Sequence, residues 1–157
     1  MNEKIAKKVG EAYAFSYVLK DLYHKTPDTL DVILGSHSAS LVSTVEDQMK
    51  GLEEVSSFFS MKEIVLPKAE RTKLKILHMG DFYVGDDWDD EAEVLEWLSF
   101  FLGGALIHWQ LVYGAAREIG DKDFIKVTKD GVDYFSSLLE KAKESAEAVG
   151  VARTKEE

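Results

Sequence analysis

The sequence predicts an all-α protein, a single-domain helical bundle of four long helices with a short helix in a long crossover between the second and third. Apolar residues recur at three- and four-residue spacing along most of the 157 residues, which is typical of amphipathic helices. No run alternates apolar and polar residues for long enough to indicate a strand. Both prolines stand where a helix can begin. We expect one domain over residues 1–150 and a frayed polar tail over residues 151–157.

The composition narrows the class of protein. Hydrophobic residues make up 45% and charged residues 31%, as in folded soluble proteins. The 29 acidic residues outnumber the 19 basic ones and give a net charge of −10, which argues against nucleic-acid binding and against docking on anionic membranes. The absence of cysteine excludes disulfides, cysteine-bound zinc and thiol catalysis. Because the first residues lack the apolar core of a signal peptide, we expect a cytoplasmic protein.

The first two helices are predicted from two apolar stripes with a proline between them. One helix extends from about Glu3 to His24, and its stripe comprises Ile5, Val9, Ala12, Phe15, Val18, Leu19, Leu22 and Tyr23. Thr26 and Pro27 form an N-cap and first-turn pair, so the second helix begins there and extends to about Phe59. Gly35 and Gly51 are weak points that can divide this second helix into two pieces.

Residues 60–90 are the least regular part of the sequence. Pro67 is expected to open a short helix through Leu77, and Gly80 is expected to end it. The residues Phe82–Val84 then form a short extended or turn segment before the next helix.

The last two long helices meet at a glycine turn. One extends from about Asp89 to Ile119, Gly120 and Asp121 mark the turn, and the other extends from about Lys122 to Val149. The inward face of the last helix comprises Phe124, Val127, Gly131, Tyr134, Phe135, Leu138 and Ala142.

The segment from Trp97 to Ala116 contains no charged residue and is long enough to span a bilayer. Ser99, His108, Gln110 and several glycines weaken its hydrophobicity. A helix that is apolar on all sides is also typical of the centre of a soluble bundle, so we expect a core helix and no membrane span.

A ferritin-like metal site is the alternative from another class of protein. Such a site needs an inward Glu on two helices and an inward Glu-x-x-His on the two others. Glu11 and His37 are the candidate ligands, but the last helix offers no inward carboxylate. The competing interpretation of His37 is a core histidine that forms a hydrogen bond with Gln48, Ser40 or a neighbouring helix.

No motif for enzymatic chemistry is recognisable. The cluster Ser36-His37-Ser38 is local, whereas a catalytic triad is defined by the spatial roles of its residues. The stretch from Gly80 to Gly85 lacks the lysine of a phosphate-binding loop. We therefore expect neither catalysis nor a cofactor.

Charge is unevenly distributed along the sequence. Residues 76–116 carry eight acidic residues and no Lys or Arg, so −8 of the −10 lies there. Seven of these acids lie between Asp86 and Glu96, more than are needed to cap a helix. Two interpretations stay open, that the acids only cap the start of the helix, or that with Trp88 and Trp97 they bind a basic, partly apolar peptide. The predicted binding residues are Asp86, Asp87, Trp88, Asp89, Asp90, Glu93, Glu96 and Trp97.

Three segments together resemble the TorD/DmsD/NarJ family of cytoplasmic chaperones that mature molybdenum oxidoreductases. YVLKDLYHKTPDTLDVI (17–33) resembles an aromatic, Leu-rich helix with a Pro-Asp turn and the helix that follows. MGDFYVG (79–85) is similar to a Tyr-x-x-Leu-Phe-x-Gly stretch, and FLGGALIHW (101–109) to a Phe-Leu-x-x-His-Leu-x-x-Trp spacing. Ala105 stands where the family often has His, and the family's Pro-x-Asp-His element is not recognisable.

The resemblance implies a non-enzymatic chaperone that binds the twin-arginine signal peptide of a client enzyme. Such a peptide pairs a basic motif with an apolar stretch, which agrees with the charge distribution. A third interpretation also stays open, a homo-oligomer that buries the face from Trp97 to Tyr113 between subunits.

Overall fold

The computed structural model describes residues 1–155, and every regular element in that range is a helix. The order is α1 (Glu3–Lys25), α2 (Pro27–Leu34), the 3-10 turn η1 (Gly35–Ser38), α3 (Leu41–Phe58), α4 (Lys62–Val84), α5 (Glu91–Ile119) and α6 (Lys122–Arg153). The predicted all-α class is confirmed.

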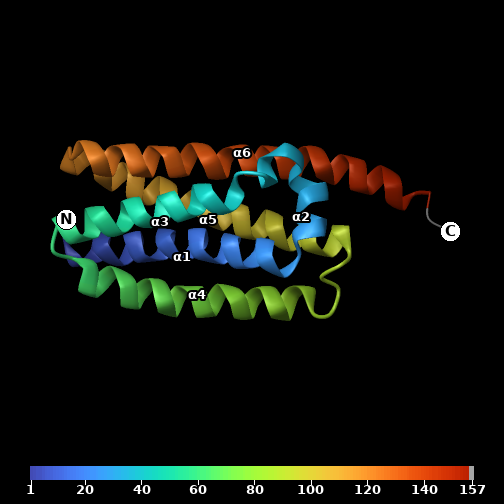
Figure 1. Cartoon of the computed structure of the whole chain (residues 1–157), viewed down its shortest axis with the longest axis horizontal. Coiled ribbons are helices and arrows are strands. Elements are labelled where there is room, and N and C mark those ends of the chain that lie inside the picture. The colour runs from blue at the N-terminus through green and yellow to red at the C-terminus, as the bar shows by residue number, and fades with distance from the viewer. Residues whose placement is uncertain (156–157) are drawn as a thin grey trace.

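The five long helices lie side by side and the short α2 lies at one end of the group (Figure 1). α1 is the central helix and packs against α3, α4 and α5. α5 and α6 form the other main pair. The connection between α4 and α5 lies at the same end of the molecule as α2 (Figure 1).

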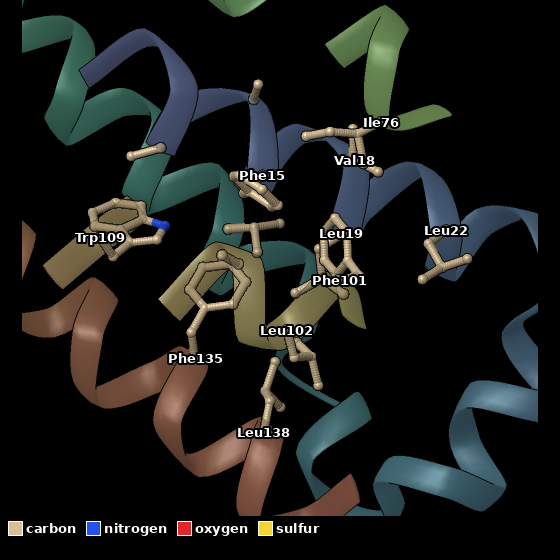
Figure 2. Packing of buried hydrophobic residues seen from close by; sticks show 14 of the residues in the cluster. Phe15, Val18, Leu19, Leu22, Ile76, Phe101, Leu102, Trp109, Phe135 and Leu138 are labelled. Atoms are coloured by element: carbon tan, nitrogen blue, oxygen red, sulfur yellow. The ribbon is translucent and has the colours of Figure 1, made fainter. Parts of the chain in front are cut away.

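α5 packs against both α1 and α6, and much of the core lies at these two contacts. Figure 2 shows Phe15 and Leu19 of α1 close to Phe101 of α5, and the rings of Phe15 and Phe101 have centroids 5.4 Å apart. Farther along α5, the Trp109 ring stacks on Phe135 of α6 at 6.1 Å. The stripe predicted for the first helix is therefore the central wall of the core.

The second predicted helix is divided at Gly35 and not at Gly51. Gly35 has a φ of +55° that favours glycine, and α2 ends there. Gly51 lies inside α3, where an added Cβ would lie 2.6 Å from Cγ2 of Val127. Gly51 thus permits α3 to approach α6 closely.

The prediction of an irregular segment over residues 60–90 is wrong for residues 62–84 and holds for residues 85–90. α4 spans 23 residues, so the predicted short crossover helix is a fifth long helix, and the short helix is α2 instead. Pro67 lies inside α4 and not at its start, where it costs one backbone hydrogen bond near the N-terminus. α4 also continues through Gly80 and ends at Gly85, whose φ is +63°. The segment Phe82–Val84 is therefore helical and not extended.

The last two helices begin within two residues of their predicted starts, and each has an aspartate as its N-cap. The side chain of Asp90 accepts hydrogen bonds from the backbone of Ala92 and Glu93, and Asp121 accepts from Phe124. α6 continues to Arg153, beyond the expected start of a frayed tail at residue 151, and Arg153 forms an ion pair with Asp90. Residues 156 and 157 of the predicted tail lie outside the described residues.

Within residues 1–155, α5 is the one helix long and apolar enough to cross a membrane by length and composition. In its most apolar 18-residue window, 33% of the residues are buried against the other helices. The core helix of a soluble protein meets the same criterion. The absence of a membrane span stays a prediction.

Candidate binding surface where α4 meets α5

The acidic turn between α4 and α5 is fixed to the rest of the molecule by its backbone. The hydroxyl of Thr26 donates to the carbonyl oxygen of Trp88 at 2.8 Å, and that of Thr29 donates to the same oxygen at 3.4 Å. Thr26 is the N-cap residue of α2, as predicted, but its side chain does not cap that helix. These contacts position the turn against α2 and leave its carboxylates outward.

Asp86, Asp87 and Asp89 are exposed and have no ion-pair partner within residues 1–155. Asp90 differs because it caps α5 and pairs with Arg153. The guanidinium and the two backbone N–H groups lower the pKa of Asp90. Of the predicted acids in the turn, Asp90 therefore supports the fold, and the other three are available to a partner.

Glu93 and Glu96 lie on the first turns of α5, where Glu93 is half-buried and Glu96 is exposed. The hydroxyl of Tyr83 donates to Glu96 at 2.9 Å, and this bond raises the pKa of the hydroxyl. The ring of Tyr83 also meets Phe100 edge-on, with centroids 5.4 Å apart. Tyr83 thus joins the carboxylates of α5 to an aromatic patch.

The two predicted tryptophans meet in one pocket, but neither lies fully on the surface. Trp97 is only 6% exposed and belongs to the core, and Trp88 is half-buried. Both line a pocket of about 390 Å³ whose other walls come from α1 and α4, and whose apolar lining includes Val18, Leu22, Ile76 and Leu77. A partner can touch Trp97 only through this pocket.

A single lysine lies at this pocket. The Lys25 ammonium is 3.9 Å from the centroid of the Trp88 ring and 2.6 Å from a carboxylate oxygen of Asp81. The positive charge of Lys25 is therefore offset by the carboxylate of Asp81 and by the face of the Trp88 ring.

The aromatic patch was not predicted as part of the site. Phe82 is 87% exposed and Phe100 is 64% exposed, beside the exposed Met79 and Tyr83. The spacing of Phe100, Ile107 and Leu111 along one side of α5 was a signal in the sequence, because Leu98 and Leu102 occupy its other side. A helix that is apolar all round can expose one of its faces.

The structure gives no support to the metal site built on Glu11 and His37. Glu11 accepts hydrogen bonds or ion pairs from Lys8, Lys68 and His108. Within the described part of the chain, no group of three or more His, Cys, Asp or Glu side chains is placed to hold a metal ion. His37 was expected to be a core histidine bonded to Gln48, Ser40 or a neighbouring helix. It is half-buried, its Nδ1 has no partner among residues 1–155, and the Gln48 oxygen accepts from Ser16 instead.

Comparison of the chain with protein-family models, curated proteins and solved structures finds no match. The likeness to the chaperone family therefore stays a prediction, and the geometry of the site carries the functional argument.

Proposed function

We propose that this protein is a non-enzymatic binding protein, of the chaperone type, for a segment that combines basic and apolar side chains. The binding site is the acidic–aromatic surface, defined by Asp86, Asp87, Asp89, Glu93 and Glu96 together with Phe82, Tyr83 and Phe100. In this proposal the helices form a bundle that presents this surface, and the protein acts in the cytoplasm.

One observation carries the proposal, the exposure of large aromatic side chains directly beside carboxylates with no basic partner. Phe82 and Phe100 are 87% and 64% exposed. Exposed apolar groups with a polar rim mark interaction sites. The neighbouring carboxylates favour a partner with Arg or Lys and disfavour an acidic one. The tryptophan pocket supplies a place for one apolar side chain of the partner.

The resemblance supplies a concrete probe. A twin-arginine signal peptide places two Arg beside an apolar stretch, so it matches both halves of the surface. We expect calorimetric titration of the full chain to show binding of an Arg-Arg peptide. We also expect binding about tenfold or more weaker for the same peptide with Gln-Gln, because the charge-assisted contacts are lost. Equal affinity for both peptides, or none for either, contradicts the proposal.

Variants locate the site. Asp86→Asn with Glu93→Gln removes two charges from the surface, and we expect the affinity for the Arg-Arg peptide to fall about three- to tenfold. Glu63→Gln with Glu147→Gln removes the same charge from exposed positions elsewhere and serves as the matched control. A similar loss in both pairs would show that net charge alone attracts the peptide.

A further inference from the structure

The outer side of α5 exposes apolar residues along the length of the helix, which extends from the α4–α5 connection beside the other long helices (Figure 1). The side chains of Phe100, Ile107 and Leu111 are 64%, 60% and 54% exposed. Gly103 and Gly114 share this side at steps of three or four residues, and an added Cβ on either would meet no atom within 4 Å. We call these five residues the α5 face, which is uncovered within residues 1–155 over about four turns.

The α5 face carries no charge. The sequence has no Asp, Glu, Lys or Arg between Glu96 and Arg117. Two copies of a chain with a net charge of −10 repel each other, and this repulsion is weakest where the uncharged surface of one copy meets the same surface of the other. The chemistry of the face therefore fits a second copy of this chain.

The order of large and small residues on the face favours a second copy that runs antiparallel. A two-fold axis through Ile107 brings Phe100 of one copy to the level of Gly114 of the other, because each lies seven residues from the axis. The same axis brings Leu111 to the level of Gly103, each four residues from it. Each of these large side chains then meets the gap left by a glycine, as knobs enter holes between packed helices.

The charges at the two ends of α5 also favour the antiparallel arrangement. Glu96 of one copy comes to the level of Arg117 and Glu118 of the other, so one attractive and one repulsive pair meet at each end. In a parallel pair the two acidic segments, residues 86–96, would lie side by side and repel each other. Antiparallel packing separates the two Glu96 residues by about 30 Å along the helix axis.

The exposed apolar area indicates how strong such a dimer would be. Met79 and Tyr83 adjoin the face from the end of α4 and are 57% and 39% exposed. Together with the three large residues of the face they present on the order of 500 Å², at about 200 Å² for each side chain when fully exposed. Two copies would bury on the order of 1,000 Å² in total, which is at the lower end for specific interfaces. We therefore expect a dimer that forms at micromolar concentrations or above.

We propose that the α5 face is the interface of a two-fold symmetric homodimer, in which two α5 helices pack antiparallel with Ile107 at the axis. This dimer goes beyond the peptide-binding role and does not rest on it. Phe100 and Tyr83 belong to both surfaces, so a second copy and a bound peptide compete for them.

Sedimentation velocity of the full chain over a range of concentrations tests the dimer. We expect a concentration-dependent change from monomer to dimer. Gly114→Leu fills the gap that receives Phe100, so it should weaken the dimer about tenfold or more although it adds apolar surface. Gly150→Leu adds the same side chain at an open, exposed glycine of α6 and should leave the affinity within about twofold.

Two results of this experiment overturn the proposal. One is a chain that stays monomeric up to about 0.5 mM. The other is association that Gly114→Leu strengthens, which would indicate non-specific contact between apolar surfaces. Circular dichroism checks that both variants fold, as expected for substitutions at glycines with no atom near the added Cβ.

The absence of cysteine from the sequence allows disulfide formation to test the arrangement. Ile107→Cys places a thiol beside its own symmetry mate, so oxidation should join the two copies. Leu111→Cys is the control, because its two thiols would lie about 12 Å apart along the helix axis, too far for a disulfide. Both reactions use concentrations at which sedimentation shows a dimer. Equal cross-linking of the two variants, or none at Ile107→Cys, overturns the antiparallel dimer.

Ionic strength separates the dimer from the proposed peptide site. Salt screens the repulsion between two copies of charge −10, so a rise from about 0.05 M to about 0.5 M should tighten the dimer about threefold. The same rise should weaken binding of the Arg-Arg peptide. A dimer that salt weakens contradicts an uncharged interface. Binding of the peptide to Gly114→Leu tests the acidic–aromatic surface separately, since none of its residues is changed.

Discussion

Single glycines determine how closely the helices approach. Gly131 lies buried in α6, and a Cβ there would lie 2.1 Å from Cε3 of Trp109 on α5. Trp109 is fully buried and stacks on Phe135, so its ring has little room to move. The missing side chain of Gly131 is therefore what allows a tryptophan at the α5–α6 contact.

We expect Gly131→Ala to destabilise the protein by about 1–3 kcal/mol, because the added methyl group overlaps the ring of Trp109. Gly103→Ala on α5 is the matched control, since its Cβ would meet nothing within 4 Å. That change is expected to stabilise the fold by up to about 1 kcal/mol through helix propensity. Urea unfolding of both variants measures the difference. A stabilised Gly131→Ala protein would show that the Trp109 ring yields freely.

One carboxylate connects three helices at the scale of elements. Glu11 of α1 is 9% exposed, and its oxygens lie 2.8 Å from Nζ of Lys8 and 3.1 Å from Nζ of Lys68 on α4. Nε2 of His108 on α5 lies 3.4 Å away. Burial by itself raises the pKa of Glu11, but the hydrogen bonds and charges of the two lysines outweigh it and lower that pKa. The ionised form is thus favoured in the folded state.

The lowered pKa of Glu11 determines whether its contribution to the free energy of unfolding rises or falls with pH. Glu11 contributes stability fully above its unfolded pKa of about 4.3, and this contribution is lost as the pH falls through the lower folded value. We expect Glu11→Gln to cost about 1–3 kcal/mol at neutral pH, because it leaves Lys68 without its partner. The difference in unfolding free energy between Glu11→Gln and the unchanged protein, measured by urea titration, should become smaller below about pH 4.

Glu70→Gln is the control for this effect, since Glu70 is an exposed carboxylate that pairs with Lys73. Its expected cost is below about 1 kcal/mol. A cost for Glu11→Gln that is constant from neutral to acid pH would contradict a role for the ionised carboxylate.

The helix ends show how much of the fold the sequence could predict. Periodicity and caps place the start of α1 and the turn at Gly120 within a residue or two, because these depend on local chemistry. Pro67 misleads because α4 accommodates a proline in its second turn, and Gly80 misleads because a tertiary contact decides its state. An added Cβ on Gly80 would lie 3.0 Å from Nε1 of Trp97, so this glycine serves helix packing and not a helix end.

The candidate site was predictable in its charge and not in its apolar part. Asp86, Asp87 and Asp89 lie exposed because few groups in a folded protein can offset so many carboxylates. Trp97 and Phe100 are both aromatic residues of the same helix and both contact Tyr83 of α4, yet the first is buried and the second is exposed. Composition does not distinguish the two, and the spacing of Phe100, Ile107 and Leu111 indicates a second apolar side of α5 without showing that it is exposed.

On the side of the molecule formed by α5, the acidic residues and the exposed apolar residues occupy different stretches of the helix. No acidic residue follows Glu96 on α5 until Glu118 in its last turn, whereas exposed apolar side chains occur between them at Phe100, Ile107 and Leu111. A partner that meets this side of the molecule therefore meets an electrostatic part first and an apolar part beyond it. The two parts should contribute to different steps of binding, since charge steers encounter and buried contact slows dissociation.

Ionic strength separates these two contributions. Raising the salt from about 0.05 M to about 0.5 M reduces the Debye length severalfold, so the association rate of the Arg-Arg peptide should fall about tenfold while its dissociation rate changes little. Phe100→Ser removes apolar contact without changing charge, so its effect should appear as about tenfold faster dissociation at both salt concentrations. Stopped-flow fluorescence of a labelled peptide measures both rates. If salt altered dissociation and Phe100→Ser altered association instead, the division of the surface into a steering part and a holding part would be wrong.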